Sequence, residues 1–91
     1  MQRQRDTEEA YKIIRRIDDM FHQGRFEEVN NMLGNLVPEN LTELQLLSYL
    51  AATRPHSARA NLPNRTEFYR KVKETLEHRE RPVKELLAGL E

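Results

Sequence analysis

The chain lacks cysteine and tryptophan, and it has only three glycines and four prolines among 91 residues. Without cysteine it has no disulfide scaffold, no thiolate nucleophile and no zinc site that uses sulfur. No apolar run approaches the roughly 20 residues of a membrane span, and the first residues show no apolar signal-peptide core. We therefore expect a cytoplasmic protein that avoids membranes and is held together by packing alone.

An excess of charge of one sign is lacking as well, because 15 Lys and Arg balance 15 Asp and Glu. The zero total gives no general reason to expect nucleic acid or an acidic membrane as a partner. Apolar residues make up 37% of the chain, so the composition of a disordered protein is not met. The length suits one core, and we expect a single helical domain spanning residues 1–91.

Apolar residues recur at steps of three and four along the chain, which is typical of helices, and no strand pattern is found. The expected helices run from a cap at Asp6 to about His22, from Phe26 to just before Pro38, from Pro38 or Asn40 to Arg54, from a cap at Asn64 to about Arg79, and from Pro82 to Leu90. Residues 1–5 are expected to fray, and residues 54–64 to form one long loop. The predicted fold is all-α, a small bundle of four main helices plus a short C-terminal helix, arranged as two stacked helical hairpins.

Two glycines are expected to shape the first hairpin. Gly24 follows the first helix and suits the left-handed conformation that ends many helices. Gly34 lies inside the second helix, where glycine costs up to about 1 kcal/mol relative to alanine. It therefore either allows a close approach of another helix or marks an early helix end.

The first hairpin resembles a tetratricopeptide helical repeat, in which an aromatic residue, a turn glycine, a second aromatic residue and two acids lead into the second helix. The residues that carry the resemblance are Phe21, Gly24, Phe26, Glu27, Glu28 and Val29, with Pro38 near the expected repeat end. Residues 11–38 cover about one repeat, and Val29 stands where the family prefers alanine. The tryptophan and first glycine positions are not matched, and no second copy follows. The resemblance implies peptide or protein binding and brings no catalytic residues with it.

The zero net charge hides two stretches of opposite charge. Residues 26–53 contain four glutamates and no basic residue, a net charge of −4, whereas residues 54–73 contain six basic residues and one glutamate, a net charge of +5. Such asymmetry marks a candidate interaction surface. We predict that an acidic protein surface binds at the basic loop and the following helix start, where the helix dipole adds positive potential. The predicted partner-binding residues are Arg54, Arg59, Arg65, Tyr69, Arg70, Lys71 and Lys73.

Other interpretations of these features stay open. The acidic and basic stretches can neutralise one another within the fold. The same basic segment, residues 54–73, also suits a nucleic-acid-associated regulator that contacts phosphates. Finally, the last predicted helix and the positions Tyr11, Phe21 or Tyr49 can expose a groove between the hairpins that takes a partner's helix or a second copy of the chain.

No motif in the sequence indicates catalysis, a cofactor or a metal. His22, His56 and His78 lie far apart, without the spacing of a helical metal site. Asp18 and His22 are four residues apart, which is typical of an ordinary exposed helix pair. We therefore predict a small non-enzymatic module for protein–protein interaction, an adaptor without catalytic residues, cofactor or metal.

Overall fold

The computed structural model describes residues 2–80 and 84–91, and in this part of the chain it contains helices and turns but no strand. In chain order the elements are α1 (Gln2–His22), α2 (Phe26–Asn35), the 3₁₀ turn η1 (Pro38–Asn40), α3 (Glu43–Thr53), the 3₁₀ turn η2 (Arg54–His56), α4 (Pro63–His78) and α5 (Lys84–Leu90). The predicted all-α fold of four main helices and a short C-terminal helix is confirmed.

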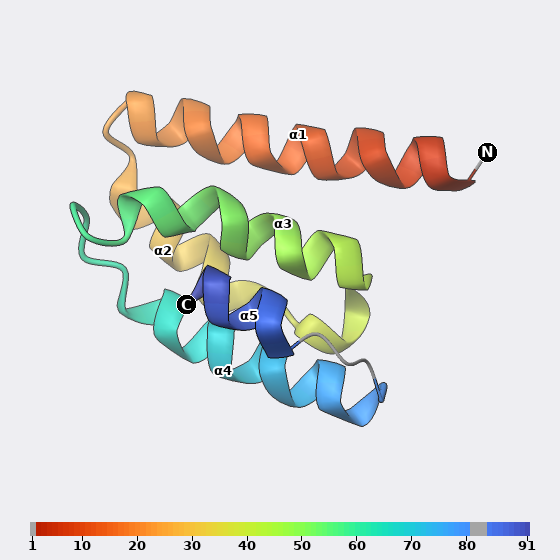
Figure 1. Ribbon diagram of the computed structural model, residues 1–91. Coiled ribbons are helices and arrows are strands. Elements are labelled where there is room, and N and C mark those ends of the chain that lie inside the picture. Colours follow the sequence, from red (N-terminus) through yellow and green to blue (C-terminus); the bar gives the residue numbers. More distant parts are fainter. Residues whose placement is uncertain (1, 81–83) are drawn as a thin grey trace.

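The helices form two stacked hairpins (Figure 1). α1 packs mainly against α3, and α2 mainly against α4, so each helix of the first hairpin lies on its counterpart in the second. α1, α3 and α5 run in one direction, while α2 and α4 run back (Figure 1). α5 contacts α3, and it lies where the first helix of a third hairpin would follow.

The core lies between the hairpins and collects apolar residues from all five helices. Its most deeply buried members are Ile17, Val29, Leu33, Leu46, Leu50, Phe68, Val72 and Leu76, and Leu87 adds the contribution of α5. In α2, α3 and α4 these residues recur at steps of four, which places them on one side of each helix. Removing this apolar surface from water is the main force that brings the helices together.

Three helix starts differ from the predicted ones. α1 begins at Gln2, so Asp6 lies inside the helix and residues 2–5 belong to it. Gln and Arg are good helix formers, and solvent can satisfy the first N–H groups of an exposed end. α3 is capped by Thr42, whose side chain accepts a hydrogen bond from Gln45 N at 3.1 Å. The Gln45 side chain accepts one from Thr42 N at 2.9 Å, which completes a capping box.

The start of α4 is held from another helix. Its predicted cap, Asn64, lies one residue inside the helix, and the side-chain oxygen of Asn30 in α2 accepts a hydrogen bond from Asn64 N at 2.9 Å. The Asn64 side chain donates in return to the main-chain oxygen of Asn30, also at 2.9 Å. A β-carbon at Gly34 would lie 2.6 Å from the Asn64 side-chain nitrogen, so the glycine is what permits this approach.

The connections between helices agree with the predictions in part. Gly24 takes the predicted left-handed conformation, with φ of 72°, between α1 and α2. Residues 54–62, predicted as part of a plain loop, begin with η2 and continue in turns. The predicted helix start at Pro82 lies outside the described residues, and α5 is described from Lys84.

Candidate functional site

Arg65 is placed inside the protein, which corrects its prediction as a partner-binding residue. Only 4% of it is exposed, because it lies on the same side of α4 as buried Phe68 and Val72. Its Nε donates to the Thr53 hydroxyl at 2.8 Å, and its Nη2 donates to the main-chain oxygen of Leu50 at 2.9 Å. The guanidinium thus satisfies acceptors at the end of α3.

The same guanidinium also holds the end of α5. Nη2 donates to the main-chain oxygen of Leu90 at 2.6 Å, and Nη1 donates to that of Glu91 at 2.5 Å. Burial lowers the pKa of Arg65, and the positive charge of nearby Arg54 lowers it further. Arg65 therefore joins three helices and has few donors left for a partner.

Two more of the predicted residues are engaged within the fold. Tyr69 is half-buried, and its hydroxyl donates to the main-chain oxygen of Leu87 at 2.9 Å, which fixes α5. Burial is the main reason why the pKa of Tyr69 is raised. Arg70 pairs along α4 with Glu67 and with Glu74. The Arg70 guanidinium lowers the pKa of Glu67 through a hydrogen bond, so this cation is already neutralised at the surface.

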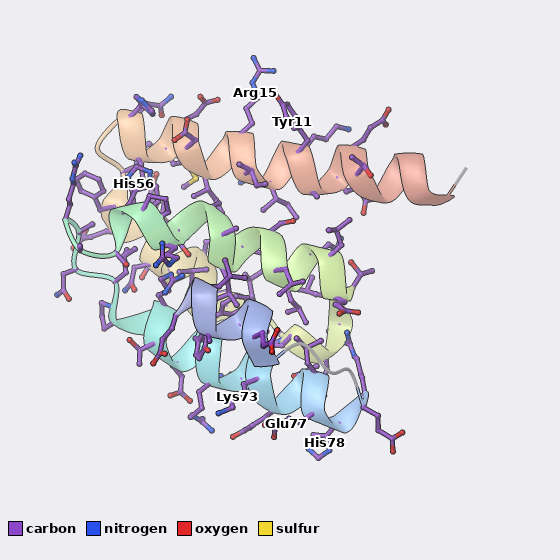
Figure 2. All side chains as sticks on the ribbon, viewed as in Figure 1. Tyr11, Arg15, His56, Lys73, Glu77 and His78 are labelled. Atoms are coloured by element: carbon purple, nitrogen blue, oxygen red, sulfur yellow. The ribbon has the colours of Figure 1, made fainter. Side chains whose placement is uncertain are left out.

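The remaining four predicted residues are exposed and fall into separate groups. Lys71 and Lys73 are two positions apart, so they lie about 200° apart around α4, on opposite flanks. Figure 2 shows Lys73 on the side of α4 that points away from α3. Arg54 and Arg59 lie in η2 and the turns that follow it, at the end of α3, and neither has an acidic partner among the described residues. The four exposed residues therefore do not form one continuous basic surface, because Arg54 and Arg59 lie at one end of the bundle and the two lysines lie apart on α4.

An exposed apolar strip on α3 was not predicted as a site. Leu44, Leu47 and Ala51 follow one another at steps of three and four, which places them on one side of the helix, and Arg54 continues the line. Leu44 is 39% exposed and Leu47 is half-buried. These two leucines, with Thr42 and Glu43, line a hollow of about 330 Å³. The sequence did contain an indication of this strip, because the apolar residues of α3 extend further around the helix than a single buried side needs.

The neighbouring helix α1 also exposes apolar side chains. Tyr11 is 67% exposed and Ile14 is 41% exposed, and they are neighbours at i and i+3. Figure 2 shows Tyr11 pointing away from the body of the bundle. Of the three aromatic positions considered for a groove, Phe21 is buried and Tyr49 is half-buried, so Tyr11 alone stays accessible.

Two of the three histidines, which are 34 positions apart in the sequence, lie close to the same aspartate in the structure. His56 stacks on Phe21, with ring centroids 4.0 Å apart, and its Nε2 lies 3.7 Å from a carboxylate oxygen of Asp18. His22 Nδ1 lies 3.7 Å from the other oxygen of Asp18 and 2.8 Å from its main-chain oxygen. This main-chain contact is the first reason why the pKa of His22 is raised, and the charge of Asp18 adds to it. The cluster joins η2 to α1.

Two kinds of arrangement, a cluster of metal ligands and a membrane-spanning helix, are not found in the described residues. No group of three or more His, Asp or Glu side chains within residues 2–80 and 84–91 is placed to hold a metal ion. Among the helices of that same part, none is both long and apolar enough to cross a bilayer.

Comparison with known proteins adds no relative to these observations. No family model matches the chain, and no curated protein or solved structure matches it.

Proposed function

We propose that this domain is a non-enzymatic interaction module that binds an amphipathic helical segment of a partner protein. The observation that carries the proposal is the exposed apolar strip on α3, formed by Leu44, Leu47 and Ala51 and ending at Arg54. Small domains use most of their large apolar residues for their own core, so an exposed row of this kind points to a covering partner.

The charges at the two ends of the strip favour one kind of partner. Arg54 and Arg59 lie at its far end without acidic partners among the described residues. Glu39 and Glu43 lie at its beginning. A helix that covers the strip is therefore complementary when its acidic end lies over the arginines and its basic end over the glutamates.

The shape of the surface suits a partner helix that has apolar residues at positions i, i+3, i+4 and i+7. The hollow next to Leu44 and Leu47 can accept one large apolar side chain of such a helix. Ile14 on the adjacent α1, which is 41% exposed, offers further apolar area. The resemblance of the first hairpin to a tetratricopeptide repeat, which implies peptide or protein binding, is in line with this proposal.

A nucleic-acid partner has less support. Such a protein needs a continuous basic surface to follow the phosphate backbone. Here Arg65 is buried, Arg70 is paired with two glutamates, and Lys71 and Lys73 lie on opposite flanks of α4. A mobility-shift assay with DNA and RNA at low salt tests this alternative directly, and retention that falls steeply with salt would favour it over the proposal.

The proposal is tested by selecting binders from a displayed library of amphipathic helical peptides with randomised charges at both ends. We expect selected peptides to carry acidic residues at one end. Leu44→Glu and Arg54→Glu should each weaken their binding at least about tenfold, equal to about 1.4 kcal/mol.

Lys73→Glu is the matched control, since it reverses a charge on α4 away from the strip and should leave binding unchanged. Circular dichroism confirms that each variant is folded. Peptides that bind Leu44→Glu and Arg54→Glu as tightly as the native domain would overturn the proposal.

A further inference from the structure

A second surface, at the corner between α1 and α2, has the charge and form of an anion site. A hollow of about 430 Å³ opens there. Its lining residues are Lys12, Arg15, Arg16, Asp19 and Met20 of α1, Gln23 of the turn and Arg25 just before α2. Met20 is buried at the hollow, and the lining combines the aliphatic stems of the long side chains with the charged ends of four basic residues and of Asp19. Figure 2 shows Arg15 pointing outward on the side of α1 opposite to α3.

Three of these cations lack a partner within the described residues. Lys12, Arg15 and Arg16 stand at i, i+3 and i+4, which brings their side chains to one side of α1. Asp19 follows Arg15 by four residues and Arg16 by three, yet neither arginine lies within ion-pair distance of the Asp19 carboxylate. Like charges at this spacing destabilise a helix, so an anion bound among them would relieve a repulsion that the fold leaves uncompensated.

Arg25 differs from these three because its position is fixed. Its Nε pairs with Glu28, its Nη1 donates to the side-chain oxygen of Gln23 at 3.1 Å, and its main-chain N–H donates to Met20 O at 2.9 Å. The hollow therefore has one wall whose side chain is held by its neighbours, beside three cations that have no acidic partner among the described residues. Such partial preorganisation lowers the entropic cost of binding.

The sum of the charges indicates the ligand. Arg25 is neutralised by Glu28, so Lys12, Arg15 and Arg16 stand against Asp19 alone, a net charge of +2. A phosphate monoester carries a charge of about −1.5 to −2 at pH 7 and presents three strong acceptor oxygens. Guanidinium groups bind such oxygens in pairs. The hollow is open to solvent, and its volume of about 430 Å³ leaves room for a phosphate group.

We propose that the hollow formed by Lys12, Arg15, Arg16 and Arg25 binds the phosphate monoester group of a small ligand. The site lies on α1 and on the turn to α2, so it is independent of the strip on α3 and extends beyond the proposed function. Two sources share this chemistry, a soluble organic phosphate and the headgroup of a phosphomonoester lipid.

The proposal is tested by titrating the ¹⁵N-labelled domain with glycerol 3-phosphate, and separately by sedimentation with vesicles that contain phosphatidic acid. With the soluble probe we expect amide shifts confined to residues 12–25 that saturate with a Kd near or below about 1 mM. Binding should weaken as the pH falls below about 6, where a monoester loses its second charge.

The double variant Arg15→Gln, Arg16→Gln should lose at least about tenfold in affinity for either probe, or about 1.4 kcal/mol. The matched control, Lys71→Gln with Lys73→Gln, removes the same charge elsewhere and should bind as the native domain does. Dependence on Arg15 and Arg16 with either probe supports the site, and the probe that binds identifies the source. No binding to either probe, equal binding by both double variants, or equal competition by sulfate and chloride at one ionic strength would overturn it.

Discussion

Replacing Arg65 by methionine tests whether this residue holds the fold together. Methionine keeps an unbranched apolar stem of similar length, so packing is largely retained while the hydrogen bonds of the guanidinium are lost. Two of these bonds, to the Thr53 hydroxyl and to Leu50 O, end on residues of α3 that are fully buried. The other two end on the main chain of Leu90 and Glu91, where water can replace the lost donor.

The two buried hydrogen bonds determine how much Arg65→Met lowers the free energy of unfolding. Hydrogen bonds from a charged group contribute about 1.5–3 kcal/mol each, and the lower figure suits acceptors that keep other partners. The Thr53 hydroxyl, for example, still donates to Tyr49 O at 2.8 Å. We therefore expect Arg65→Met to lower the free energy of unfolding by about 3 kcal/mol. A domain of this size has about 5–14 kcal/mol in total, so the loss is large but leaves the protein folded.

The assay is urea unfolding followed by circular dichroism, with a thermal melt as a second measurement. A loss of about 3 kcal/mol corresponds to a fall in Tm of about 12–24 °C for a domain of this length. Lys73→Met is the matched control, and its effect should stay within about 0.5 kcal/mol because Lys73 is exposed. Amide exchange in α5 should also accelerate in Arg65→Met. If Arg65→Met unfolds within about 1 kcal/mol of the native protein, the structural role assigned to Arg65 is wrong.

Three further predictions concern the helix ends and the pH dependence. Thr42→Ala removes the cap of α3 and should cost about 1 kcal/mol in urea unfolding; an unchanged midpoint would refute the cap. Gly34→Ala should change the free energy of unfolding more favourably, by about 1 kcal/mol, when Asn64 has also been replaced by alanine, because the added β-carbon meets the Asn64 side chain in the native protein. The same change in unfolding free energy with and without Asn64→Ala would contradict the close approach. The pKa of His22 is raised in the folded state, so its contribution to stability is present below the unfolded pKa of about 6.5 and is lost as the pH rises through the folded value. Unfolding curves between pH 5 and 8 should therefore show a fall in stability toward high pH that is smaller in His22→Gln, and an identical or larger fall in the variant would exclude the contact with Asp18.

The residues of the predicted surface are divided in the structure: Arg54 and Arg59 lie at one end of the bundle, Lys71 and Lys73 are exposed on opposite flanks of α4, and Arg65 is buried. Charge counting by segment treats all basic residues alike, although Arg65 falls in register with Phe68 and Val72 on the buried side of its helix. That register could have been recognised from the periodicity, because residues at i, i+3 and i+7 share a face. The acceptors that satisfy Arg65 could not, since they come from residues 12 to 26 positions away in the sequence.

The basic hollow on α1 shows the opposite case. The spacing of Lys12, Arg15 and Arg16 can be read from the sequence. Asp18 and Asp19 follow them closely, however, so a count of charges along this segment does not indicate a local excess of positive charge. Only the structure shows that Asp18 lies between two histidines, while Asp19 forms no ion pair with either arginine. Whether a charge is free depends on rotamers and neighbours, which a count of residues does not contain.

By itself the sequence determined the helical class, the number of helices and the turn at Gly24, because helix periodicity and turn chemistry depend on residues a few positions apart. The tertiary structure alone decided which charges are free and which serve as internal bonds. It also decided where α4 begins, since Asn30 caps it from 34 residues away. Long-range partners of this kind are set by the packing of whole helices, which sums many weak contacts that no local pattern records.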